Sequence, residues 1–146
     1  LDSLSIIHFV QPGLLLDVGS GAGLPGIVIA IMKPETEVFV LDSVGKKCRF
    51  MQVVKSELAL ENLIVVNSRV ESFKPKESFS QIASRAFAEA SKTIQLTKHL
   101  LEENGRYLLM KGSNVDEEDI DNLNVKVHSM TVPFVSDKRS LLEIQL

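Results

Sequence analysis

Residues 15–26 read LLDVGSGAGLPG, an apolar run followed by one aspartate and four glycines. Three of these glycines, Gly21, Gly23 and Gly26, fit the spacing G-x-G-x-x-G, and Asp42 follows Gly23 by 19 residues. This pattern is typical of a turn from strand to helix at which the backbone meets a nucleotide, with an acid placed to accept a hydrogen bond from a ribose hydroxyl. The stretch therefore predicts a cofactor-binding loop.

Asp17, two residues before Gly19, discriminates between two cofactors that fit such a loop. A dinucleotide would place a pyrophosphate there, where a carboxylate is unfavourable. S-adenosylmethionine carries an ammonium and a sulfonium group instead, and both cations favour a nearby carboxylate. Glycines let the backbone approach the ligand closely because they have no side chain. The sequence thus favours S-adenosylmethionine, with its methionyl part at Asp17, Gly19, Gly21 and Gly23 and its ribose at Asp42.

Plainer interpretations of the same residues stay open. The glycines alone would make a tight turn, with Asp17 capping a local group. Asp42 precedes SVGKK, where an acid also caps a helix. If the loop binds a dinucleotide, the protein is a nicotinamide-dependent oxidoreductase.

Positive charges gather directly after the second predicted strand, where the run GKKCR places Lys46, Lys47 and Arg49 at the start of a helix. Charged clusters on a helix usually form a solvated face. Cations at a helix N-terminus oppose the helix dipole, however, so helix stability does not explain their position. Contacts with RNA phosphates would explain it, and Lys111, at the end of a later strand, is expected at the same edge of the sheet.

Strand and helix patterns alternate along the chain, since unalternating apolar runs predict buried strands and spacings of three and four predict helices. This order predicts an α/β fold with a mostly parallel sheet, a C-terminal antiparallel hairpin, and ligands beyond the carboxyl ends of the strands. The predicted strands are 14–18, 37–42, 63–67, 80–85, 106–112, 125–132 and 139–146, and the predicted helices are 4–9, 26–33, 46–60, 91–103 and 115–123.

Two sets of apolar side chains bear on these elements. Phe50, Val53, Val54 and Leu58 recur at helical spacing, which predicts that they form the buried face of helix 46–60. Phe87 follows strand 80–85, and its ring is expected either to pack in the fold or to stack on an RNA base.

The composition excludes several classes of protein. The 146 residues include one cysteine, Cys48, and three scattered histidines, which excludes an internal disulfide and gives no metal-ligand spacing. A net charge of −3 argues against a surface that binds polyanions as a whole. The apolar runs are too short to cross a bilayer and no secretory signal is visible. We therefore expect one soluble, metal-free domain over residues 1–146, located in the cytoplasm and without a membrane partner.

Five motifs in this order resemble one known family, the bacterial small-subunit ribosomal RNA guanine-N7 methyltransferases, also called the glucose-inhibited division protein B family. Together they are far more specific than a glycine loop, and they extend over nearly the whole chain. They are DVGSGAGLPG (17–26), VLDSVGKKCRF (40–50), SRVESF (68–73), SRAFA (84–88) and LMKG (109–112).

The resemblance implies a class I, Rossmann-like methyltransferase that uses S-adenosylmethionine to methylate N7 of one guanine in small-subunit ribosomal RNA, free or in the 30S particle. Guanine N7 has a lone pair and no proton, so catalysis is expected to rest on positioning, without a catalytic residue. By position, the cofactor would contact Gly19, Leu24, Asp42, Val70, Glu71 and Arg85, and the RNA would contact Lys46, Lys47, Lys111 and Arg139.

The chain also departs from the family pattern. The family usually has an N-terminal helical segment, which is expected to be missing before LDS. An aspartate often follows Phe79 in the family, where this chain has Ser80. Two alternative functions therefore stay open: methylation of a small molecule, and RNA binding without catalysis on a truncated methyltransferase fold.

Overall fold

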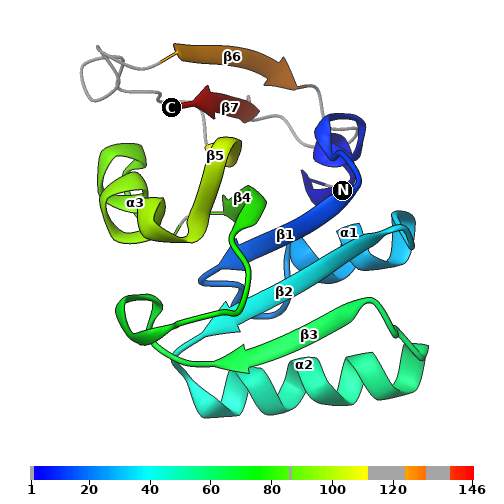
Figure 1. Ribbon diagram of the computed structural model, residues 1–146. Coiled ribbons are helices and arrows are strands. Elements are labelled where there is room, and N and C mark those ends of the chain that lie inside the picture. Colours follow the sequence, from blue (N-terminus) through cyan, green and yellow to red (C-terminus); the bar gives the residue numbers. More distant parts are fainter. Residues whose placement is uncertain (1, 86, 112–123, 131–138) are drawn as a thin grey trace.

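A computed structural model of the protein describes residues 2–85, 87–111, 124–130 and 139–146. Its strands form one seven-stranded sheet (Figure 1). The strands are β1 (Gly13–Val18), β2 (Thr36–Asp42), β3 (Leu63–Asn67), β4 (Phe79–Arg85), β5 (Leu101–Lys111), β6 (Asn124–Met130) and β7 (Arg139–Gln145). The helices are α1 (Gly26–Met32), α2 (Gly45–Leu58) and α3 (Ala90–Thr97), with 3₁₀ segments η1 (Asp2–Phe9), η2 (Val70–Ser72) and η3 (Lys98–Leu100).

The strand order is β3-β2-β1-β4-β5-β7-β6. Strands β1 to β5 pair in parallel, whereas β7 lies antiparallel between β5 and β6. The predicted α/β fold with a mostly parallel sheet and a terminal antiparallel hairpin is confirmed. Strand order reverses between β1 and β4, so the loops that follow these two strands meet at the carboxyl edge, where open sheets of this kind bind ligands.

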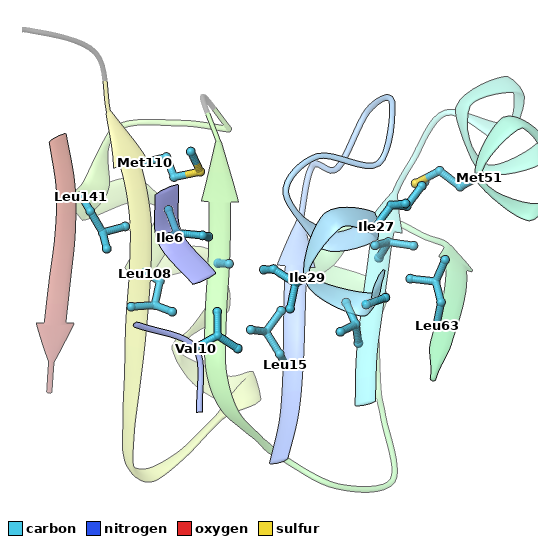
Figure 2. Close-up of a cluster of buried hydrophobic side chains, with 14 of the residues drawn as sticks. Ile6, Val10, Leu15, Ile27, Ile29, Met51, Leu63, Leu108, Met110 and Leu141 are labelled. Atoms are coloured by element: carbon cyan, nitrogen blue, oxygen red, sulfur yellow. The ribbon is translucent and has the colours of Figure 1, made fainter. Parts of the chain in front are cut away.

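Alternate residues of the central strands enter two separate cores. Leu15 and Val40 pack with Ile29 of α1 on one face of the sheet (Figure 2). Their neighbours Leu16 and Leu41 belong to the cluster on the opposite face, to which α3 contributes. Burial on both faces explains why these strands read as unalternating apolar runs.

The helix predicted over residues 91–103 is too long. Helix α3 ends at Thr97, a 3₁₀ turn follows, and Leu101 already pairs with Phe79 of β4. Strand pairing with a segment more than 20 residues away therefore overrides the local helical pattern. Asn104, just beyond the predicted helix, has a φ of 67° and lies at an irregularity inside β5.

Helix α2 turns a different face to the sheet from the predicted one. Its buried residues are Cys48 and Met51, and Lys55, one turn further on, donates a hydrogen bond to the carbonyl oxygen of Leu63 in β3. This face and the predicted one both have helical spacing, so periodicity alone could not choose between them. Val54 packs against the core, but the other predicted inward residues are half exposed or more: Phe50 (52%), Val53 (57%) and Leu58 (52%).

The remaining predicted elements have mixed outcomes. The N-terminal segment predicted as a helix over residues 4–9 is the 3₁₀ segment η1, which packs beside α1. The acidic helix predicted over residues 115–123 lies outside the described residues. None of the helices described here is long and apolar enough to cross a membrane.

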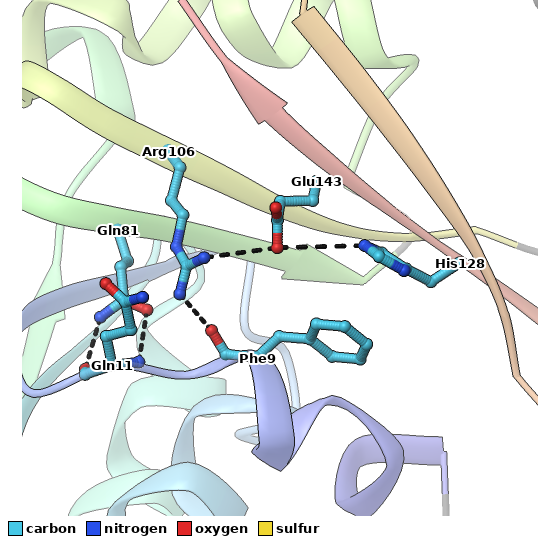
Figure 3. A network of polar contacts seen from close by, with 6 residues as sticks. All are labelled: Phe9, Gln11, Gln81, Arg106, His128 and Glu143. Carbon is cyan, nitrogen blue, oxygen red and sulfur yellow. Dashed lines mark hydrogen bonds and ion pairs between the residues drawn. The ribbon is translucent and has the colours of Figure 1, made fainter.

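Arg106 in β5 ties the segment before β1 to the sheet (Figure 3). Its Nη1 lies 3.3 Å from Oε2 of Glu143 in β7, and its Nη2 donates to the carbonyl oxygen of Phe9. Beside it, the Gln81 side chain accepts from the backbone N–H of Gln11 at 2.9 Å and donates to its carbonyl oxygen at 2.7 Å. These contacts fix where β1, and with it the glycine loop, enters the sheet.

Replacing Arg106 tests this tie. In Arg106→Leu the side chain of Glu143, 18% exposed, loses its hydrogen-bond partner and keeps only His128, whose Nε2 lies 4.0 Å from Oε2, among the described residues. The carbonyl of Phe9 loses a charged donor. We expect the free energy of unfolding to fall by about 2 kcal/mol, measured by urea denaturation. Lys98→Leu, which replaces an exposed lysine, is the control. A loss no larger than in this control would contradict the assignment.

Candidate functional site

A cavity of about 350 Å³ opens at the carboxyl edge of the sheet, beside the point where the strand order reverses. Its walls come from the segments that follow β1, β2, β3 and β4, which are far apart in the chain. Predicted site residues and others share this lining, which includes Gly19, Asp42, Lys47, Arg69, Glu71 and Phe87.

The glycine loop between β1 and α1 has a backbone that only glycine adopts easily. Gly19, Gly21 and Gly23 have φ values of 65°, 59° and 94°. A Cβ on Gly19 would lie 2.5 Å from Cδ2 of Phe87, and one on Gly23 would overlap the side chain of Ile27. Gly21 faces open space, so its conformation alone requires glycine. Gly19 is the member of this loop that lines the cavity.

Asp42, at the end of β2, lines the cavity and also holds the glycine loop. Its Oδ2 accepts a hydrogen bond from the backbone N–H of Gly21 and its Oδ1 one from that of Val44, each at 2.9 Å. The second bond orders the residue before α2. Asp42 therefore lies in the cavity wall and contacts the residue before α2, but no side chain in the described part of the chain caps α2 itself.

Asp17 lies behind the loop, on the side of α1, and is absent from the described cavity lining. It is fully buried, and its Oδ2 accepts a hydrogen bond from the backbone N–H of Gly26 at 2.8 Å. Its Oδ1 is buried without a hydrogen-bond partner among the described residues. Burial raises the pKa of Asp17 to about 8, against smaller opposite effects of the Gly26 N–H, Ser20 and the charge of Arg85.

The other predicted cofactor residues divide into two groups. Val70 and Glu71 line the cavity from η2. Leu24, in the turn before α1, and Arg85, at the exposed end of β4, do not belong to the described lining. Arg85 is still close enough to Asp17 for its charge to affect the pKa of that carboxyl.

The residues predicted to face RNA all lie at the carboxyl edge. Lys46 and Lys47 are exposed in the first turn of α2, and Lys47 lines the cavity. Arg139 begins β7, and because β7 runs antiparallel to β5, it lies beside the end of β5 that carries Lys111. The structure therefore brings these residues to one rim of the sheet.

Lys111 differs from the lysines of α2. It is half-buried, and its ammonium donates a hydrogen bond to the carbonyl oxygen of Ala88 at 2.6 Å. Burial lowers the pKa of Lys111, and the charge of Glu89 acts in the opposite direction.

The cavity also contains residues that the sequence did not single out. Ser68 and Arg69 line it from the segment after β3, directly before the predicted pair Val70 and Glu71. Their place in the motif SRVESF (68–73) and their position just past the carboxyl end of a strand were the available signals. Phe87, for which two roles were open, packs on Gly19 and lines the cavity.

Ser80, the departure from the family pattern, lies at the amino end of β4, away from the cavity. Its hydroxyl donates a hydrogen bond to the carbonyl oxygen of Leu14 at 2.9 Å. Its effect is on the pairing of β1 with β4. Within the part of the chain that the structure describes, no cluster of His, Cys, Asp and Glu side chains could hold a metal ion.

Two solved structures with this fold are described as methyltransferases. A predicted O-methyltransferase from Agrobacterium tumefaciens, Atu636, superposes with a TM-score of 0.80 at 15% identity over 99% of this chain and 80% of its own. A methyltransferase from Aquifex aeolicus that depends on S-adenosylmethionine gives a TM-score of 0.77 at 14% identity over 99% and 89% of the two chains. At this identity the likeness shows the fold alone.

Other proteins are much more similar to this chain in sequence than these two structures are. Ribosomal RNA small subunit methyltransferase G of Ruthia magnifica is 54% identical over 142 residues, 97% of this chain and 70% of the relative. The protein of the same name from Methylobacillus flagellatus is 46% identical over 144 residues, with the same coverage. A sequence model of the family rRNA small subunit methyltransferase G matches residues 1–142. The chain therefore belongs to the rRNA small subunit methyltransferase G family.

Proposed function

We propose that the protein binds S-adenosylmethionine in the cavity and transfers its methyl group to N7 of a guanine in small-subunit ribosomal RNA. The family match over residues 1–142 carries this proposal, and the names of the relatives give small-subunit ribosomal RNA as their substrate. The substrate is the RNA or the 30S particle that contains it, so the proposed place of action is the cytoplasm.

The residues of the site fit this cofactor. Asp42 offers carboxylate oxygens to the ribose, beside Val70 and Glu71 for the adenine. The glycine loop and Leu24 would hold the methionyl part, whose carboxylate suits the guanidinium of Arg85. The buried Oδ1 of Asp17, which has no hydrogen-bond partner among the described residues, favours a cation on the other side of the loop.

The proposed chemistry needs positioning rather than proton transfer. Bound S-adenosylmethionine would supply an electrophilic methyl group, and guanine N7 offers a lone pair without a proton to remove. Holding two reactants in the right geometry contributes about 7–11 kcal/mol.

Calorimetric titration tests the cofactor. We expect the chain to bind S-adenosylmethionine and not NAD. Binding of NAD alone would refute the proposal and favour an oxidoreductase.

Methyl transfer is tested with small ribosomal subunits from cells that lack this modification. We expect one methyl group per particle at guanine N7, located by chemical cleavage of the RNA. Cofactor binding without any transfer would instead favour an RNA-binding protein without catalysis.

Asp17→Asn tests whether the buried carboxyl of Asp17 favours the bound cation, by measuring cofactor affinity as a function of pH. In the free protein its pKa of about 8 keeps it largely neutral at pH 7, and a bound cation favours its ionised form. Binding then releases a proton, so affinity for S-adenosylmethionine should rise with pH towards 8, by at most tenfold per pH unit. Because the variant cannot ionise, the ratio of wild-type to variant affinity should grow between pH 6 and pH 9, which also cancels the cofactor's own titration. A ratio independent of pH would exclude this role.

The dependence of RNA affinity on salt concentration tests whether the lysines of α2 contact RNA phosphates. For a single-stranded RNA, each phosphate contact contributes about 0.7 to the slope of log affinity against log salt concentration. Lys46→Ala combined with Lys47→Ala should therefore weaken RNA binding and reduce the slope by about 1.4. Lys98→Ala, at the opposite edge of the sheet, should leave the slope unchanged. Equal slopes in all three proteins would remove these lysines from the RNA interface.

A further inference from the structure

The loop between β4 and α3 brings an aromatic ring onto the glycine loop. A Cβ placed on Gly19 would lie 2.5 Å from Cδ2 and 3.2 Å from Cγ of Phe87, so this ring covers the Cα of Gly19. Phe87 lines the same cavity as Asp42 and Glu71. The position of this ring therefore decides how the cavity is closed on the side of β4.

A charged hydrogen bond connects this loop to the neighbouring strand. The Lys111 ammonium donates to the carbonyl oxygen of Ala88, the residue directly after Phe87, at 2.6 Å. A hydrogen bond from a charged donor is short and about twice as strong as a neutral one. Lys111 itself is held in β5, where it pairs with Ser140 of β7. The sheet thus anchors the loop through the side chain of Lys111.

The environment of Lys111 is unlike that of a residue that binds phosphate. Its side chain is half-buried, while Lys46 and Lys47 on the same rim are exposed. Burial costs a compact, strongly hydrated ammonium part of its solvation, and the carbonyl of Ala88 compensates for this loss. Glu89, the next residue of the loop, adds an opposite charge close to Lys111. An RNA phosphate would have to compete with both partners.

We infer that Lys111 is a positioning residue: it holds the loop at Ala88 so that Phe87 closes the cofactor cavity over Gly19. This inference rests on the proposed function, and it replaces the RNA contact that the family resemblance implied for Lys111. Its consequence is that loss of Lys111 weakens cofactor binding first and RNA methylation only as a result.

Lys111→Met tests the inference, because methionine keeps most of the side-chain volume and removes the donor. The full chain is titrated with S-adenosylmethionine by calorimetry, and its RNA affinity is measured against salt concentration. We expect cofactor affinity to fall about tenfold and the salt slope to stay unchanged. Lys46→Met, the matched control, should leave the cofactor affinity unchanged and make the salt slope shallower.

The opposite result for Lys111→Met, a shallower salt slope with unchanged cofactor affinity, would show that Lys111 is a phosphate ligand and overturn the inference. If the wild-type chain itself does not bind S-adenosylmethionine, the proposed function fails instead. The two failures are therefore distinguishable.

A double-mutant cycle shows whether Lys111 acts through Phe87. Phe87→Leu alone should also weaken cofactor binding, and Lys111→Met should have little further effect in that background. Losses that simply add would overturn the inference. Lys111→Arg, which keeps a charged donor, should recover part of the affinity, and it remains informative if the methionine variant does not fold. Absence of any recovery at an unchanged melting temperature would count against the proposed bond.

Discussion

The bonds of Asp42 hold together the parts that make the cavity. Its carboxylate accepts the backbone N–H groups of Gly21 in the glycine loop and of Val44 before α2. Its carbonyl oxygen accepts from the N–H of Ser68, after β3, and from the thiol of Cys48 in α2. One residue at the end of β2 therefore fixes the segments that follow β1, β2 and β3. Asp42 also lines the cavity, so the residue that orders the site lies in its wall.

The two aspartates on either side of the glycine loop have different environments, and this changes the argument about cofactor choice. Asp42 receives two backbone N–H bonds, whereas the fully buried Asp17 receives one, from Gly26, and its pKa is raised to about 8. Repulsion of a pyrophosphate by Asp17 requires an ionised carboxylate, but in the free protein at neutral pH this group is largely protonated. Its preference for a cation can appear only when a cation is present. Family membership, rather than this charge alone, therefore selects S-adenosylmethionine.

Sequence patterns predicted the parts of the molecule that depend on local chemistry. The buried strands, the terminal hairpin and the glycine loop follow from apolar runs and from backbone conformations that require glycine, and Gly19 and Asp42 do lie in the cavity wall. The predictions of the buried face of α2 and of the end of α3 were wrong. Two sets of residues in α2 have helical spacing, and Leu101 pairs with Phe79 of the distant strand β4. The bond from Lys111 to Ala88 joins residues 23 positions apart, and no spacing rule in the sequence indicates it.

The carboxyl edge of the sheet divides into two halves with different tasks. On the side of β2 and β3, Lys46, Lys47 and Arg69 are exposed next to the cavity. On the side of β4 and β5, Lys111 is engaged with a loop of the protein itself. Three strand spacings, roughly 14 Å in total, separate β2 from β5. The strand order reverses between these halves and Phe87 lies there, so under the proposed function a base would approach the cofactor between them. Cations that attract the RNA on one side and an anchored loop on the other would then act on the same nucleotide without competing for it.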